Sequence, residues 1–281
     1  MPLAKCTKCK GTTADSLGFM FVKSGYGAPG GAHCLGFCAV TVANILWIIG
    51  CVGVAAFAQS LAGFGFGLLA VPMMQMALSP RDAVIISTLI GAISTTTQAV
   101  IDRDRAHVPT VKRLTIASYL GMPLGLVVFV LVSDSALRIT LGVVVILAAI
   151  VLSRGFTLHD DSHHFDWLLG MLSGVLATST STNGPPLVFL MQARNMSPEV
   201  FRSTINAIFS FANIGALALF FASGKMNFHT LYGALAAVPA LFISLRIGYS
   251  LRPRVSAEFF RKLVLVMLLL SGASLLLKAL L

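Results

Sequence analysis

Residues 42–80 read VANILWIIGCVGVAAFAQSLAGFGFGLLAVPMMQMALSP and contain no charged side chain. A water-soluble fold of 281 residues has no core large enough to hide several stretches of this kind. The composition agrees, because 57% of the chain is hydrophobic and only 11% is charged, whereas about 25% of the residues in soluble domains are charged. We therefore expect an integral membrane protein.

Charged residues divide the chain into eight uncharged runs. An ionised side chain is costly in hydrocarbon, and a spanning helix needs about 20 apolar residues, so each run marks a candidate membrane element. The runs are 24–80, 83–101, 114–133, 139–153, 167–193, 203–224, 226–245 and 263–277. The fold class predicted is all-α, a polytopic transmembrane helical bundle of about eight membrane elements in two repeated halves with broken helices.

The chain carries 20 Lys and Arg against 10 Asp and Glu. In a membrane protein such an excess usually reflects cationic loops facing the cytoplasm, so we expect no nucleic-acid partner. The chain has no P-loop, no acidic residue inside a run and no recognisable nucleophile with its base. We expect neither an enzyme nor a cofactor.

Residues 1–37 form an N-terminal arm that precedes the transmembrane part. Cys6, Cys9, His33 and Cys34 have the residue types of a zinc site. A single C-x-x-C is weak evidence for such a site, so we expect a disordered arm without metal. A role for the arm in assembly or sensing stays open.

Two repeats are predicted after the arm, at 38–155 and 166–281. A shift of 118 residues places Ser79-Pro80 on Ser197-Pro198. In both halves a break rich in glycine, proline or polar residues is followed by an apolar stretch, the Ser-Pro pair and a hydrophobic span. Duplicated halves of this kind are common in transporters.

The two breaks carry most of the chemical information. The first lies in GFGFGLLAVP (63–72), where each glycine weakens a helix by about 1 kcal/mol. The second lies in TSTSTNGPP (178–186), where capping side chains precede prolines that suit a first helical turn. We expect both helices to open there, with a new half-helix starting near Pro185.

Exposed N–H groups at a half-helix N-terminus carry about half a positive charge. Irregular backbone at membrane depth is tolerated only against protein or a watery cavity. Two such ends facing each other predict an anion site, and the alternative is that the glycines only allow close helix packing.

Polar residues on the following spans add to this site. Thr88 and Thr95 lie seven residues apart on one helical face, and the same shift carries them to Asn206 and Asn213. As a repeated pair they are candidate cavity residues, and interhelical hydrogen bonding is the alternative.

The break sequences also resemble a known family. GFGFGLLAVP (63–72), Ser79-Pro80 and Ala83 are similar to the first signature of the sulfite exporter TauE/SafE family of membrane permeases, which includes the toluene sulfonate uptake permease group. NGPPLV (183–188) resembles its second-half counterpart, and the likeness runs from residue 52 to the C-terminus. Phe66 departs from the family, which commonly has glycine there. The resemblance implies a permease of the bacterial inner membrane that moves sulfite, sulfonates or related small anions.

These observations predict a permease that binds a small anion between the two broken segments. A gated anion channel and a non-transporting assembly or sensing protein are the alternatives. The lipid bilayer is the other expected partner, and self-association is left open. The predicted substrate-binding residues are Gly63, Gly65, Gly67, Thr88, Thr95, Thr182, Asn183, Gly184, Pro185, Asn206 and Asn213.

The halves are either parallel or inverted in the membrane. Outside the arm, parallel halves place seven Lys and Arg on one side and nine on the other, whereas inverted halves place four and twelve. The positive-inside rule favours the uneven distribution. We expect inverted halves with the twelve-charge side in the cytoplasm.

Overall fold

The computed structural model describes residues 42–137, short pieces between 139 and 147, and residues 163–194, 196–226 and 228–251. All of these residues belong to one compact unit, Ala39–Leu281. The predicted arm and the predicted run 263–277 lie outside the described residues, as does most of the run 139–153.

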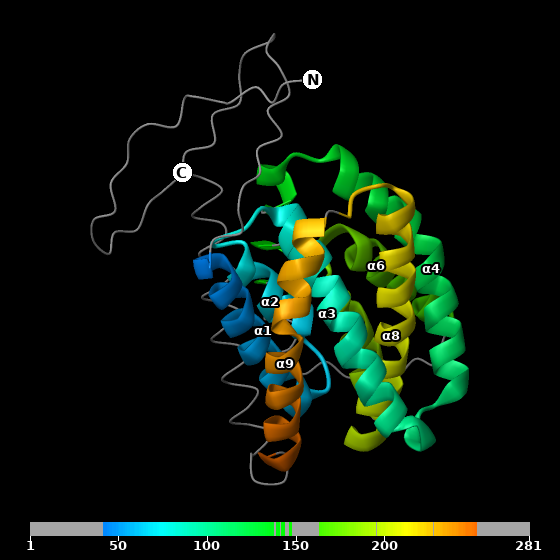
Figure 1. Ribbon diagram of the computed structural model, residues 1–281. Coiled ribbons are helices and arrows are strands. Elements are labelled where there is room, and N and C mark those ends of the chain that lie inside the picture. The colour runs from blue at the N-terminus through cyan, green and yellow to red at the C-terminus, as the bar shows by residue number, and fades with distance from the viewer. Residues whose placement is uncertain are drawn as a thin grey trace, which may run out of the picture. The chain divides into compact units, whose positions relative to one another are not determined.

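The described part is helical and contains no strand (Figure 1), which confirms the all-α prediction. Five of its helices are long and apolar enough to cross a membrane, so the predicted count of about eight elements is not confirmed. The elements are α1 (Val42–Ala62), α2 (Phe66–Met74), α3 (Pro80–Ile101), the 3-10 turn η1 (Arg103–Arg105), α4 (Val108–Leu131), α6 (His163–Thr180), α7 (Gly184–Ala193), α8 (Pro198–Ala222) and α9 (Phe228–Leu251).

Both predicted breaks are present. α1 ends just before Gly63, whose φ is 83°, and α2 begins just after Gly65, whose φ is 96°. Glycine adopts these left-handed conformations at little cost, so the chain turns sharply between the two helices. The second break separates α6 from α7 at residues 181–183, and α7 begins at Gly184, one residue before the predicted start.

Each broken pair of helices is a hairpin. Trp47, near the start of α1, donates from Nε1 to the carbonyl oxygen of Met73, near the end of α2, at 3.0 Å. In the second hairpin, Arg194, just after α7, lies 2.6 Å from the carboxylate of Asp166, in the first turn of α6. The chain therefore returns to its starting level in both hairpins.

The halves have opposite orientations. Near the end of α3, the Asp102 carbonyl accepts from Ser203 near the start of α8 at 2.6 Å. Further inside, the hydroxyls of Thr96 and Ser210 lie 2.7 Å apart. Numbers rise along α3 while they fall along α8, so these two central helices are antiparallel.

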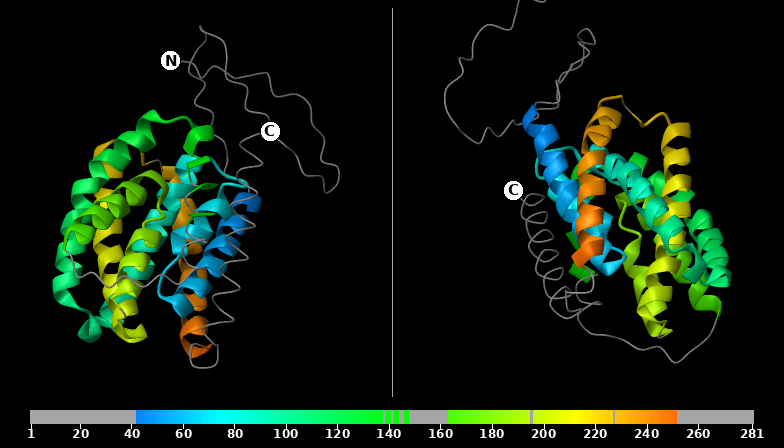
Figure 2. Two further views of the ribbon diagram at one scale, coloured as in Figure 1. Left: turned by 180° about the vertical axis from the view of Figure 1, so that it is seen from behind. Right: turned by 60° about the horizontal axis from the view of Figure 1, so that its bottom comes forward.

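Helix packing follows the same inverted relation. The repeat shift matches α1 with α6 and α4 with α9. In the structure α1 packs along α9, and α6 packs along α4, as Figures 1 and 2 show. Each hairpin is therefore supported mainly by a helix of the other half.

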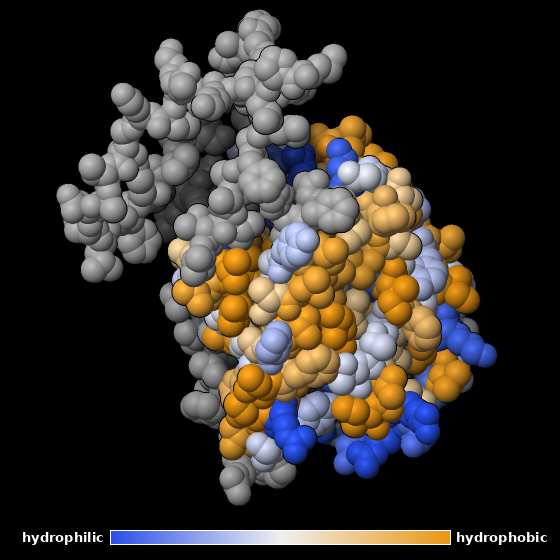
Figure 3. All heavy atoms as spheres, viewed as in Figure 1, coloured by the Kyte–Doolittle hydropathy of each residue, from blue (hydrophilic) through white to orange (hydrophobic). Residues whose placement is uncertain are grey.

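Apolar and charged side chains occupy different zones of this bundle. Figure 3 shows hydrophobic residues over the middle of the visible face and hydrophilic ones gathered at its lower end. That end is rich in cations from the α3–α4 connection and from the flanks of α7 and α8. By the contacts above, its described cations include Arg103, Arg105, Lys112, Arg113, Arg194 and Arg202, and the opposite end has Arg81 and Lys225.

One buried acidic residue holds the second hairpin to its neighbour. Asp166 in α6 is fully buried and lies 2.7 Å from Arg113 of α4 and 2.6 Å from Arg194. The two guanidinium groups together provide charge-assisted hydrogen bonds to both carboxylate oxygens. Three helices are thereby fixed at one end of the bundle.

The two hairpins touch at their breaks. A Cβ atom placed on Gly67, in the first turn of α2, would overlap the backbone oxygen of Ser181 in the second break. Ser181 itself has a left-handed φ of 55°. Glycine at position 67 is therefore required for the close approach of the two hairpins.

The inverted arrangement predicts labelling from opposite sides of the membrane. We expect Asp104→Cys and Lys225→Cys, each in a background without the five native cysteines, to react with an impermeant thiol reagent from opposite faces. Asp104 is 90% exposed in the α3–α4 connection, and Lys225 is exposed between α8 and α9. Labelling of both variants from one face would contradict the inverted arrangement.

The Asp166 cluster predicts a large stability effect. Asp166→Asn removes the negative charge that Arg113 and Arg194 bind, and these side chains are only 27% and 17% exposed. Breaking a buried ion pair on one side costs about 3–5 kcal/mol, so thermal unfolding in detergent should shift clearly. The control Asp104→Asn removes an exposed carboxylate and should cost less than about 1 kcal/mol. Equal shifts would show that the cluster is not structural.

The hairpin contact predicts a difference between two glycines. Gly67→Ala should destabilise the protein by about 1–3 kcal/mol, because the new methyl group meets backbone that has little room to move. Gly184→Ala is the matched control, since its Cβ would meet atoms at 3.7 Å or more. Melting temperatures of both variants check this, and an equal loss would mean that the hairpins do not meet at Gly67.

Candidate functional site

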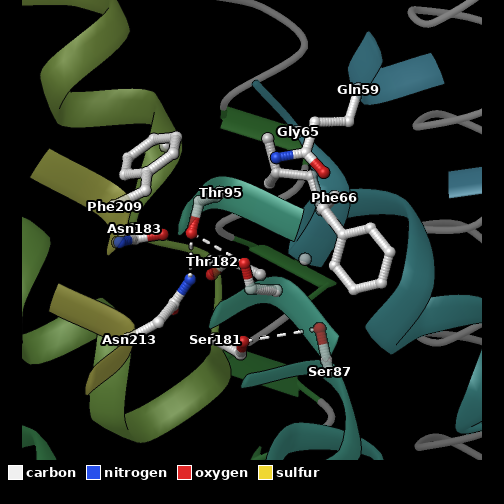
Figure 4. Close-up of a pocket in the computed structure, with 14 residues that line it drawn as sticks. Gln59, Gly65, Phe66, Ser87, Thr95, Ser181, Thr182, Asn183, Phe209 and Asn213 are labelled. Atoms are coloured by element: carbon white, nitrogen blue, oxygen red, sulfur yellow. Dashed lines mark hydrogen bonds between the residues drawn. The ribbon is translucent and has the colours of Figure 1, made fainter. Parts of the chain in front are cut away.

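A pocket lies between the two breaks, at the middle of α3 and α8 (Figure 4). It is small, with a cavity volume of about 20 Å³, and part of it is open to the surroundings. Its walls come from both hairpins and both central helices. The lining residues are Gln59, Gly65, Phe66, Gly67, Leu68, Ser87, Gly91, Thr95, Ser181, Thr182, Asn183, Gly184, Phe209 and Asn213.

The N-terminus of α2 forms one wall of the pocket. Gly65 is the N-cap residue of α2 and provides no side-chain cap. The Gly65 carbonyl is the first acceptor within this turn, and it accepts the N–H of Leu69. The amides of Phe66, Gly67 and Leu68 therefore have no intrahelical acceptor. A Cβ on Gly65 would meet nothing within 4 Å, so the space beside this turn is open.

The N-terminus of α7 forms the facing wall but offers fewer donors. Pro185 and Pro186 follow Gly184 in its first turn, and proline has no N–H. Just before the helix, Asn183 is only 8% exposed, and its Nδ2 has no hydrogen-bond partner among the residues that the structure describes. A buried donor without a partner is costly, which indicates that an acceptor belongs in this part of the pocket.

Hydroxyl groups line the remaining walls. Thr95 donates to the Gly91 carbonyl at 2.7 Å and accepts from Nδ2 of Asn213 at 3.4 Å. Ser181 faces Ser87 across the breaks at 3.4 Å, as Figure 4 shows. A hydroxyl hydrogen can rotate toward a ligand, so each of these groups can donate to an acceptor in the pocket.

None of the lining residues that the structure describes carries a charge. Arg202 of α8 lies beside the first break, where its aliphatic stem packs against Gly63. The Asp166 cluster lies instead at the far end of the α6–α7 hairpin. The positive potential of the pocket therefore comes mainly from backbone dipoles.

The structure brings seven of the eleven predicted site residues into this lining: Gly65, Gly67, Thr95, Thr182, Asn183, Gly184 and Asn213. The other four are not lining residues. Gly63 packs on Arg202, and Pro185 has no N–H to offer. Thr88 uses its hydroxyl on the Val84 carbonyl at 2.8 Å and on Ser181 at 3.1 Å. Asn206 donates to the Arg202 carbonyl at 2.9 Å.

Sequence reasoning missed several lining residues. Gln59 precedes the first break by one helical turn, and its Oε1 accepts from Ser94 at 2.7 Å. Ser87 is the neighbour of Thr88, and Ser181 lies inside the TSTSTN stretch. A lone amide just before a break was the available signal for Gln59. No sequence signal pointed to Phe209, because an aromatic residue that lines a pocket cannot be told from other apolar residues of the same span.

The chain is similar in sequence to known membrane transporters. The family model for the sulfite exporter TauE/SafE matches residues 48–275. A probable sulfite/organosulfonate exporter TauE from Cupriavidus necator is 25% identical over 242 residues, which cover 81% of this chain and 91% of that protein. No solved structure matches the chain.

A probable inner membrane transporter protein TsaS from Comamonas testosteroni is 30% identical over 105 residues, or 37% of this chain. The chain thus matches only 44% of the length of that relative. The match to the family model is much longer than the match to this relative. It includes nearly all of both hairpins and both central helices. This chain belongs to the sulfite exporter TauE/SafE family and is an anion permease integral to the inner membrane.

Proposed function

We propose that the transported anion is a small sulfur oxyanion, sulfite or an organosulfonate, or a related carboxylate, and that it binds in the pocket between the two breaks. The relative named a probable sulfite/organosulfonate exporter supports this substrate class. The observation that carries the site is that the N-terminal turn of α2 shares a pocket with buried Asn183, whose Nδ2 has no partner among the described residues.

An anion is the ligand that these groups fit. The pocket presents backbone amides, side-chain amides and hydroxyls, and its described lining has no carboxylate. Donors fixed in a site of low polarity bind an anion well because they need no reorganisation. Phe66 and Phe209 add apolar surface, which suits an organic substituent. We propose binding and release here, without a catalytic step.

Transport follows from the inverted architecture. The two predicted repeats, 38–155 and 166–281, are the proposed moving units, and the pocket lies where their hairpins meet. Rocking of one unit against the other exposes a fixed midplane site first to one side and then to the other. We place the more cationic end in the cytoplasm.

A matched pair of threonines tests the site. Thr95 and Thr97 are both in α3, and each donates to the carbonyl four residues earlier at 2.7 Å. Thr95 lines the pocket and Thr97 does not. We expect Thr95→Val to weaken substrate binding about 10-fold or more, because a hydrogen bond to a charged group is worth about 1.5–3 kcal/mol.

Thr97→Val should leave affinity within about threefold of wild type, because this hydroxyl bonds to a carbonyl of its own helix and does not line the pocket. Counterflow in proteoliposomes and binding to purified protein provide both measurements. Equal effects of the two variants would remove the pocket from the transport pathway. Flux without counterflow would instead identify a gated channel.

A further inference from the structure

We infer that this pocket selects its anion by valence, binding a singly charged oxyanion and excluding a doubly charged one of the same shape. The inference rests on the proposed function, because it assumes that the pocket is the anion site. It goes further by assigning the charge state of the substrate: a sulfonate, bisulfite or a monocarboxylate, but not sulfate or the sulfite dianion.

The positive potential in the pocket matches one negative charge. The N-termini of α2 and α7 both face it, and each contributes the equivalent of about half a positive charge. The described lining adds no ionised side chain. Together the two helix ends compensate roughly one elementary charge.

A second negative charge is disfavoured by desolvation. The cost of moving an ion out of water rises with the square of its charge, so it is about four times higher for a dianion. The attraction to fixed dipoles rises only in proportion to the charge, about twofold. A neutral pocket therefore favours the monoanion unless it contains many additional donors.

Additional donors are few. The prolines at the start of α7 remove two amides from that helix end. The hydroxyls of Thr180 and Thr182 already bond each other at 2.6 Å, and Ser181 and Ser87 lie 3.4 Å apart. These groups must give up a protein partner before they bind a ligand.

Asn183 shows independently that an acceptor belongs here. Its side chain is more than nine-tenths buried, and Nδ2 has no partner. Figure 4 places it beside Thr95 and Asn213 at the pocket wall. This side chain supplies a donor without supplying charge.

Arg202 is a described cation whose charge would alter the valence preference if it reached the pocket. Its stem contacts Gly63, and its carbonyl accepts from Asn206, but it is not a lining residue. If its guanidinium acted on the substrate, the local charge would suit a dianion. An Arg202→Gln variant therefore belongs in the test.

The probes are methanesulfonate and sulfate, which have nearly the same shape and differ by one charge. Binding to the purified full-length protein and counterflow in proteoliposomes are measured for both. We expect methanesulfonate to bind at least about 10-fold more tightly than sulfate, a difference of about 1.4 kcal/mol. Apparent affinity for total sulfite should fall as rising pH converts bisulfite to the dianion. Affinity for methanesulfonate, which keeps its charge, should stay constant.

Asn183→Asp places a negative charge at the pocket wall with almost no change of shape, and it should abolish methanesulfonate binding. Asn44→Asp, in the first turn of α1 and outside the lining, is the control with the same chemical change. Melting temperatures establish that both variants are folded. Arg202→Gln should keep the preference for methanesulfonate.

Sulfate binding equal to or tighter than methanesulfonate binding would overturn the valence inference and leave the proposed function intact. A preference of the wild type for sulfate that turns into a preference for methanesulfonate in Arg202→Gln would show that this side chain sets the valence, which also overturns the inference. Retained binding in Asn183→Asp would place the anion elsewhere. Binding of neither probe would remove the proposed function together with the inference.

Discussion

Backbone N–H groups inside a membrane must find partners, because lipid offers none. In both hairpins of this protein the helix is interrupted, at residues 63–65 and 181–183, and its regular backbone hydrogen bonds are interrupted with it. The breaks are tolerated because they face each other in the interior of the bundle, where Gly67 lets the backbone of Ser181 approach. The remaining amides are those that a ligand can satisfy, so the constraint that shapes the fold also creates the site.

Because the two halves are inverted, the two helix breaks meet and line one pocket. Since α3 and α8 run antiparallel, the N-termini of α2 and α7 approach the same space from opposite ends of the bundle. Each hairpin packs on a helix of the other half. The Asp166 cluster adds a further link between the halves, because it joins the α6–α7 hairpin to Arg113 of α4.

Local signals in the sequence predicted the backbone well. Glycine and proline act on their own positions, so the breaks at 63–67 and at Gly184 could be found from residue types alone. Which side chains face the pocket depends on the rotation of each helix, which tertiary packing sets. Thr88 and Thr95 share a helical face, yet Thr88 bonds to Ser181 while Thr95 lines the pocket. The buried role of Asp166 was not predicted either. A charged residue beside an apolar run resembles a loop residue, and its contacts with two arginines are visible only in the folded structure.

The proposed place of the transported anion is between the two breaks. A crystal structure of the full-length protein with bromomethanesulfonate would locate the ligand through the anomalous signal of its bromine. The account predicts a single peak in the pocket, with the sulfonate oxygens within hydrogen-bonding distance of the α2 amides and of Nδ2 of Asn183. A fully occupied peak elsewhere in the bundle, with the pocket empty, would contradict it.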